Sequence, residues 1–122
     1  MGMSNEKIPA WCAGEEWCPM TAASNIIGKK WHPVILSMLI EEERGFNELK
    51  DNVKGISSKV LSENLEDLQE KDLVERKVVS EKPFRVKYSV TAAGEELGPV
   101  LEELRKWSQH HLRPSEKQES VI

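Results

Sequence analysis

A cluster of basic residues surrounds Pro83. Five Lys and Arg side chains fall within twelve residues: Arg76, Lys77, Lys82, Arg85 and Lys87. Cations at this density can neutralise phosphate groups, along a nucleic-acid backbone or inside a minor groove. Surface hairpins also carry such charges for solubility alone. The cluster therefore indicates a nucleic-acid interface without establishing one.

A second candidate for nucleic-acid contact is the polar face of a helix expected over 57–71. Three leucines hold the opposite face toward the core, at positions 61, 65 and 68. Small polar residues in a first turn let a helix end approach base edges, and a helix N-terminus favours phosphate. The alternative is the solvated face of an ordinary amphipathic helix. The outward-facing candidates are Ser57, Ser58, Lys59, Ser62 and Glu63.

Cys18 is the candidate for thiol chemistry. It precedes Pro19, which suits the first position of a helix, so its sulfur lies where backbone N–H groups favour a thiolate. The alternative is an inert, buried cysteine that only caps the helix. Cys12 is either its partner thiol or has no role. Two cysteines without a Cys or His cluster make a poor metal site, so we expect no metal and no cofactor.

Enzymatic motifs are missing from the sequence. The three histidines are His32, which begins a helix, and His110 and His111, which end one. No Ser-His-Asp order, glycine-rich phosphate loop or recognisable carboxylate pair accompanies them. We therefore expect that the protein is not an enzyme.

The elements that must position these residues follow from hydrophobic spacing and from Pro and Gly punctuation. Four helices are expected, over 19–27, 34–43, 46–53 and 57–71, and the VILSMLI run makes the second the buried centre. Two strands, 73–80 and 85–90, form a hairpin through residues 81–84. A long helix over 91–112 follows, kinked at Pro99. Two short helices joined by a tight turn and followed by a basic hairpin predict a mainly α (α+β) winged helix-turn-helix with a two-stranded wing.

The last helix carries an apolar stripe wider than one core requires. Either the stripe packs inside its own chain, or it pairs two copies with help from Trp11 or Trp17. We favour a homodimer, because two heads match half-sites about one helical turn apart on double-stranded DNA. The expected dimer contacts are Trp17, Leu97, Val100, Leu101, Leu104 and Trp107.

Several motifs in combination resemble the HxlR-type family of winged-helix transcriptional regulators, which is related to the MarR-like group. They run from Cys18-Pro19 through IGKKW at 27–31, FNEL at 46–49, GIS at 55–57, KVL at 59–61 and LVER at 73–76 to PVL at 99–101 and Trp107. The resemblance implies a homodimeric DNA-binding repressor or activator, with 57–71 as recognition helix and 75–88 as wing. Ser58 and Asn64 stand where relatives often carry Gln and Arg, so this recognition helix is less basic. Pro33 and the acidic run at 41–43 are further departures.

The resemblance also implies a role for the cysteines, because several relatives use a Cys before this Pro to sense electrophiles or oxidants. By that resemblance Cys18, with Cys12 as the weaker candidate, is a sensor whose modification shifts the two DNA-binding heads.

The two ends of the chain are polar. We expect residues 1–17 to form a loosely ordered arm, 18–112 the DNA-binding and dimerisation domain, and 113–122 a mobile polar tail.

Charge and length set the remaining limits. The 122 residues suit one domain and contain no apolar run long enough to cross a membrane. The N-terminus lacks the apolar core of a signal peptide, so we expect a cytoplasmic protein with reduced thiols. The net charge of −4 is uneven: residues 44–90 hold ten Lys and Arg against nine Asp and Glu, and the rest hold seven against twelve. The acidic pI near 5.5 and three glutamates on the 57–71 helix, Glu63, Glu66 and Glu70, favour an alternative function: a winged-helix protein-interaction module that does not bind DNA.

Overall fold

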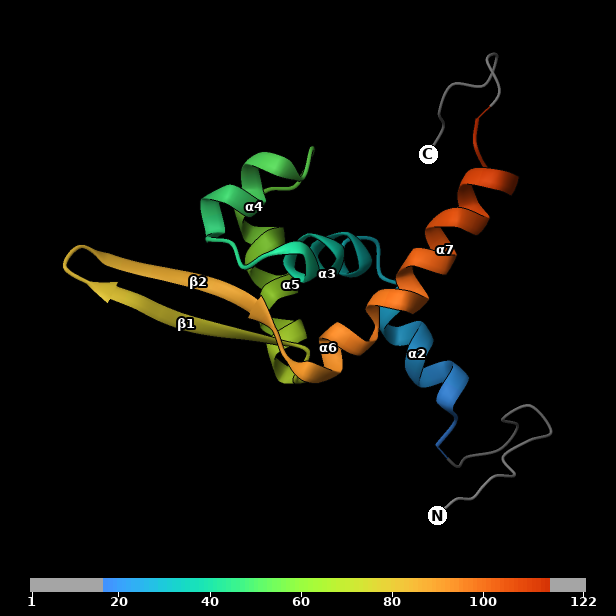
Figure 1. Ribbon diagram of the computed structural model, residues 1–122, viewed down its shortest axis with the longest axis horizontal. Coiled ribbons are helices and arrows are strands. Elements are labelled where there is room, and N and C mark those ends of the chain that lie inside the picture. Colours follow the sequence, from blue (N-terminus) through green and yellow to red (C-terminus); the bar gives the residue numbers. More distant parts are fainter. Residues whose placement is uncertain (1–16, 115–122) are drawn as a thin grey trace.

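The computed structural model describes residues 17–114, so the expected arm except Trp17 and nearly all of the expected tail lie outside the described residues. The described chain forms four helices, an antiparallel hairpin and two further helices (Figure 1). This is the mainly helical winged helix-turn-helix fold that the sequence predicts. The elements are α2 (Pro19–Ile27), α3 (His32–Glu41), α4 (Phe46–Asn52), α5 (Ser58–Glu70), β1 (Val74–Glu81), β2 (Phe84–Val90), α6 (Ala92–Glu96) and α7 (Gly98–His111).

The hydrophobic core is built around α3, as its apolar sequence predicts. α3 lies between α5 and α7 in Figure 1, and its Ile35, Leu36 and Leu39 are buried. Leu49 of α4 and the leucines of α5 complete the same cluster. Each such side chain contributes about 1.5–3 kcal/mol through its burial, so these residues fix how α5 sits on the body.

The turn between α4 and α5 is short because Gly55 adopts a φ of +87°, a conformation that side-chain-bearing residues rarely reach. Val53 and Ile56 on either side of the turn are buried. The Ser57 Oγ then accepts a hydrogen bond from the Val60 N–H at 3.1 Å and caps α5, as predicted. The first turn of α5 is thereby held at the surface.

The second predicted helix ends earlier than expected. α3 stops at Glu41 rather than near residue 43, since Glu42 is already extended. The reason lies two residues further on: Arg44 pairs with Tyr88 of β2 through N–H···O bonds of 3.1 and 2.8 Å. This pairing, which hydrophobic spacing does not reveal, ties the base of the hairpin to the helical body.

The hairpin is longer than predicted, because Glu81 pairs with Phe84 and only Lys82 and Pro83 form the turn. The sequence prediction placed all four residues 81–84 in the loop, whereas the structure extends both strands to this exposed end of the hairpin. A bulge at Val79 shifts the register of β1 between Val78 and Ser80, whereas β2 continues without interruption. The hairpin projects well away from the helices (Figure 1).

The final helix is broken rather than kinked. Thr91 caps α6 as predicted, but α6 ends at Glu96 and α7 begins at Gly98. Pro99 lacks the N–H that would bond to the Glu95 carbonyl, and its ring crowds that carbonyl, so the helix is interrupted just before it. No helix among residues 17–114 is both long and apolar enough to cross a membrane.

Candidate nucleic-acid interface

The polar face of α5 lies at the surface, as predicted. Leu61, Leu65 and Leu68 are buried on one side of the helix. Ser57 and the predicted contacts Ser58, Lys59, Ser62 and Glu63 are exposed. The Lys59 ammonium lies 3.5 Å from the Glu63 carboxylate, and the Lys59 side chain is 82% exposed. An exposed pair of this kind is worth well under about 1 kcal/mol, so Lys59 can leave Glu63 for a phosphate at little cost.

The structure divides the five predicted hairpin cations by face. Lys77 pairs directly with Lys87 across the strands, and alternation along β2 places Arg85 on the same face as Lys87. Arg76 pairs with Tyr88 on the opposite face, and Lys82 lies in the turn. Three of the five cations therefore share one side of the wing.

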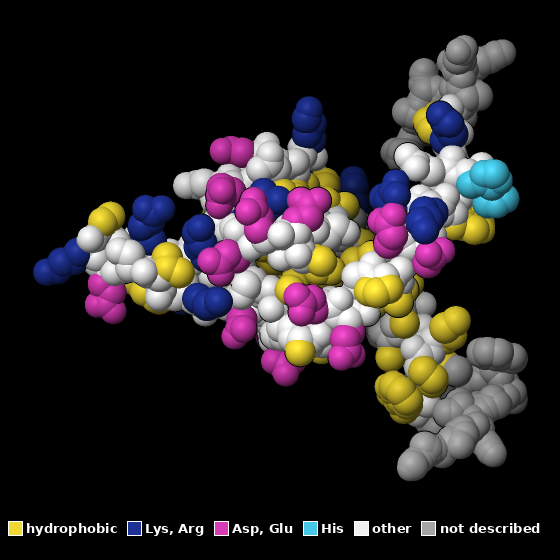
Figure 2. All heavy atoms as spheres, in the orientation of Figure 1, with side chains coloured by type: hydrophobic (Ala, Val, Ile, Leu, Met, Phe, Trp, Pro, Cys, Tyr) yellow, Lys and Arg dark blue, Asp and Glu magenta, His cyan; other side chains and the backbone are white. Residues whose placement is uncertain are grey.

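Charge is distributed unevenly over the surface. Figure 2 shows Lys and Arg side chains along the projecting hairpin, whereas acidic side chains gather over the helical body. Lys77 is partly neutralised by Glu43, 3.5 Å away. Within residues 17–114, Lys82, Arg85 and Lys87 form no ion pair with an acidic side chain. These three cations remain available to an anionic partner.

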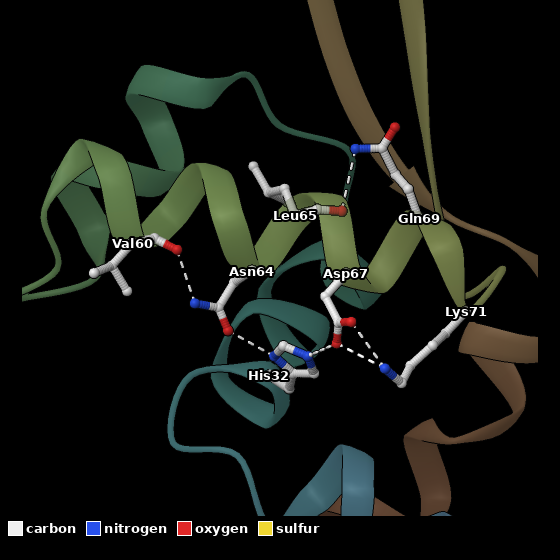
Figure 3. A network of polar contacts seen from close by, with 7 residues as sticks. All are labelled: His32, Val60, Asn64, Leu65, Asp67, Gln69 and Lys71. Carbon is white, nitrogen blue, oxygen red and sulfur yellow. Dashed lines mark hydrogen bonds and ion pairs between the residues drawn. The ribbon is translucent and has the colours of Figure 1, made fainter.

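A buried polar network lies on the inner side of α5 (Figure 3), and the sequence did not predict it. His32, only 2% exposed, places Nδ1 at 2.6 Å from the Asn64 Oδ1 and Nε2 at 2.7 Å from the Asp67 Oδ2. Lys71 donates to both Asp67 oxygens at 2.9 Å. The hydrogen bond from His32, and then that from Lys71, lowers the pKa of Asp67 from its ordinary 3.8 to about 2.

The predicted dimer residues separate into two groups. Leu101 belongs to the core of the single chain, and Leu97 packs against that core. Trp17, Val100, Leu104 and Trp107 are exposed, Trp17 by 70% and Trp107 by 54%. A groove of about 510 Å³ lies between α3 and α7, and of these four residues only Leu104 lines it, with Pro33, Val34, Ile40 and Arg105 among others.

Cys18 caps α2 as predicted, accepting a hydrogen bond from the Thr21 N–H at an N···S distance of 3.5 Å. It is buried and disulfide-bonded. The expectation of a reduced thiol is therefore wrong for this structure. That expectation rested on the cellular compartment, whereas a disulfide forms where local geometry brings a second sulfur close. Cys12 lies outside the described residues.

Comparisons with known proteins agree with this fold. The model of the HxlR-like helix-turn-helix family matches residues 26–116. The transcriptional regulator YodB of Bacillus subtilis is 33% identical over 104 residues, which span 84% of this chain and 93% of that protein. YvaP of the same organism, an uncharacterised regulator of the same type, is 36% identical over 101 residues, or 82% of this chain and 94% of that protein.

Solved structures give the same result. The reduced form of YodB from B. subtilis superposes with a TM-score of 0.72 at 33% identity, over 82% of this chain and 99% of that one. The redox regulator HypR in its oxidised form superposes with a TM-score of 0.73 at 27% identity, over 79% and 99%. The chain therefore belongs to the HxlR-like helix-turn-helix family, and it is a transcriptional regulator rather than an enzyme.

Proposed function

We propose that the protein is a homodimeric, cytoplasmic regulator that binds specific sites on double-stranded DNA. α5 reads the major groove with Ser58, Lys59, Ser62 and Glu63. The wing holds the flanking backbone or minor groove through Lys82 and Arg85. The observation that carries this proposal is the exposed polar first turn of α5 on a helix anchored by three buried leucines. A wing follows along the chain, and its Lys82, Arg85 and Lys87 pair with no acidic side chain among residues 17–114.

The test is a fluorescence-anisotropy titration against the DNA upstream of the gene itself, across several salt concentrations. Replacing Lys59 and Arg85 together with Ala should weaken binding and reduce the salt slope by about one unit for each lost phosphate contact. Lys106→Ala, on exposed α7, is the matched control for loss of a cation. Unchanged affinity and slope in the double variant would contradict this assignment of the interface.

The dimer proposal rests on the exposed apolar side chains Val100, Leu104 and Trp107 of α7, with Trp17. Contiguous apolar patches of this kind mark interaction sites, and a two-fold axis would bring the same patch of two copies together. A single head makes few contacts, whereas two heads fit a palindromic site. Sedimentation at micromolar concentration should give twice the chain mass, and a monomer would contradict the proposal.

The proposed signal is oxidation or alkylation at Cys18. The structures of YodB include diamide-treated and quinone-bound forms, and HypR is described as a redox regulator. In this chain the disulfide-bonded Cys18 represents the oxidised state. In the reduced protein, two thiols would pass two electrons and two protons to diamide and form one disulfide, with Cys12 as the proposed partner. Cys18→Ser should keep its DNA affinity after diamide, measured beside mass spectrometry of the treated protein. Loss of DNA binding by the treated variant would place the switch elsewhere.

A protein-interaction module without DNA binding is the second candidate. Lys59 and Lys77 both face carboxylates, and Glu63 and Glu66 lie exposed on α5. This candidate expects no affinity for any genomic fragment at low salt, together with a stable complex with another protein. Salt-sensitive binding to upstream DNA rejects it.

A further inference from the structure

His32 is buried at the first residue of α3, yet both of its ring nitrogens contact polar groups of α5. Nδ1 lies 2.6 Å from the Asn64 Oδ1 and Nε2 lies 2.7 Å from the Asp67 Oδ2 (Figure 3). Asn64 and Asp67 are one helical turn apart, so they grip the ring from the same face of α5. The contact joins the central helix of the core to the proposed recognition helix.

The orientation of the Asn64 amide is fixed by a third group. Its Nδ2 donates to the Val60 carbonyl at 2.8 Å, which leaves Oδ1 toward His32. The reverse orientation would place two oxygens against each other at Val60. Because an amide oxygen only accepts hydrogen bonds, the Nδ1 of His32 must carry a proton to make this contact.

The other ring nitrogen faces a carboxylate. Lys71 donates to both oxygens of Asp67 at 2.9 Å, and with His32 it holds the pKa of that carboxyl at about 2. Asp67 is therefore ionised at neutral pH and also only accepts, so Nε2 must carry a proton. A neutral imidazole has a single N–H, and only the imidazolium supplies both.

The charges around the ring are few. On α5, Asp67 opposes the cation directly and Lys71 lies beyond it. α2, which packs on α3, has no charged residue. Within the described part of the chain, α4, α6, α7 and the strands give His32 no hydrogen bond or ion pair. The N-terminus of α3 itself disfavours a cation, so the acceptors of α5 must offset that cost.

We propose that His32 is a buried imidazolium that positions α5 on α3. The consequence for DNA binding rests on the proposed function of α5 as recognition helix. Loss of one ring proton leaves a lone pair facing either the Asn64 oxygen or the Asp67 carboxylate. One contact must then open, and α5 loses one of the two polar contacts that join it to α3. DNA affinity accordingly depends on both ring protons.

The state of the ring is tested first, on the free protein. Nitrogen-15 NMR of the histidine side chains should show both nitrogens of His32 protonated at neutral pH, with exposed His110 and His111 as internal references. In Asn64→Ala, which removes one acceptor, the Nδ1 proton should be lost while Asp67 keeps that on Nε2. A bare nitrogen on His32 in the unaltered protein at neutral pH overturns the proposal.

The positioning role is tested by DNA affinity at neutral pH and constant ionic strength. His32→Gln cannot donate to both Asn64 and Asp67 as the imidazolium does, and it should bind DNA about tenfold more weakly than the unaltered protein. His110→Gln is the matched control and should behave like the unaltered protein.

The possible failures of this test are distinguishable. If the unaltered protein binds no DNA at any pH, the proposed function fails, while the NMR result still decides the state of the ring. If His32→Gln does not fold, the Asn64→Ala variant replaces it in the same titration and should also bind DNA more weakly. Unaltered DNA affinity in a folded variant overturns the positioning role.

Discussion

α5 and α7 are amphipathic helices of similar length, with 13 and 14 residues. Only α5 has its apolar face buried within the chain, however. α5 buries three leucines and, on the same inner side, engages His32 through Asn64 and Asp67. α7 buries only Leu101 and leaves three large apolar side chains at the surface: Val100, Leu104 and Trp107.

The difference separates two kinds of amphipathic surface. The apolar face of α5 is used up within the chain, so its outer face is free to carry a function of its own. The apolar face of α7 exceeds what the core needs, and the excess is what we propose a second copy covers. Variants on α5 should therefore change folding, whereas variants on α7 should change assembly.

The largest expected effect contrasts two leucines. Leu65→Ala leaves a cavity beneath α5 and should lower the free energy of unfolding by about 3 kcal/mol. Leu104→Ala removes the same atoms from a side chain that is 39% exposed and should cost the monomer well under about 1 kcal/mol. Urea unfolding at low protein concentration measures both. Equal losses would mean that α7 is as much a part of the core as α5.

The next effect concerns the polar side of the α5 contact. The pKa of Asp67 is lowered from 3.8 to about 2, so its ionised form adds stability above about pH 4 that is lost as pH falls toward 2. Asp67→Asn should cost about 2 kcal/mol at neutral pH and flatten the loss of stability between those pH values. Thermal melts across this range check the slope, and exposed Asp51→Asn is the control. A parallel slope in both variants would show that Asp67 contributes nothing to it.

The sequence predicts most of the fold because the decisive signals are local. Pro19, Gly28 and Ser57 mark helix ends that the structure confirms, and the VILSMLI run identifies the buried centre. Pro99 marks the position of the break in the last helix but not its extent, which depends on whether packing restores a continuous helix beyond the proline.

The missed features all depend on partners distant in sequence. His32 lies 32 residues from Asn64 and 35 from Asp67, so nothing in its neighbourhood indicates a buried network. The only sequence signal is the spacing of Asn64, Asp67 and Lys71, which places three polar groups on one side of α5. The pairing of Arg44 with Tyr88 is equally long-range and shortens α3.

A smaller effect tests how the outer end of α5 is held. Ser57→Ala removes the acceptor of the Val60 N–H and should cost about 1 kcal/mol. Ser62→Ala, exposed within the same helix, is the control and should be close to neutral. Chemical unfolding of both variants measures the difference. If both variants are neutral, the Ser57 cap does not anchor the first turn.

Leu104→Glu is expected to have the smallest effect on folding and the largest effect on assembly. Leu104→Glu places a charge in the exposed apolar surface of α7 and should leave the stability of the monomer within about 0.5 kcal/mol. Gln109→Glu adds the same charge to the same helix, and its carboxylate can still accept from Arg105 as the amide does at 3.1 Å. Sedimentation velocity should show monomers for Leu104→Glu and dimers for Gln109→Glu.

DNA binding then reports on the same surface. If α7 joins two heads, Leu104→Glu should weaken binding to a site with two half-sites but leave binding to a single half-site unchanged, because α5 and the wing are untouched. Anisotropy titrations with the two DNA lengths separate these outcomes. Equal losses on both would mean that the substitution damages the head itself, and the contrast between a self-contained α5 and an open α7 would not hold.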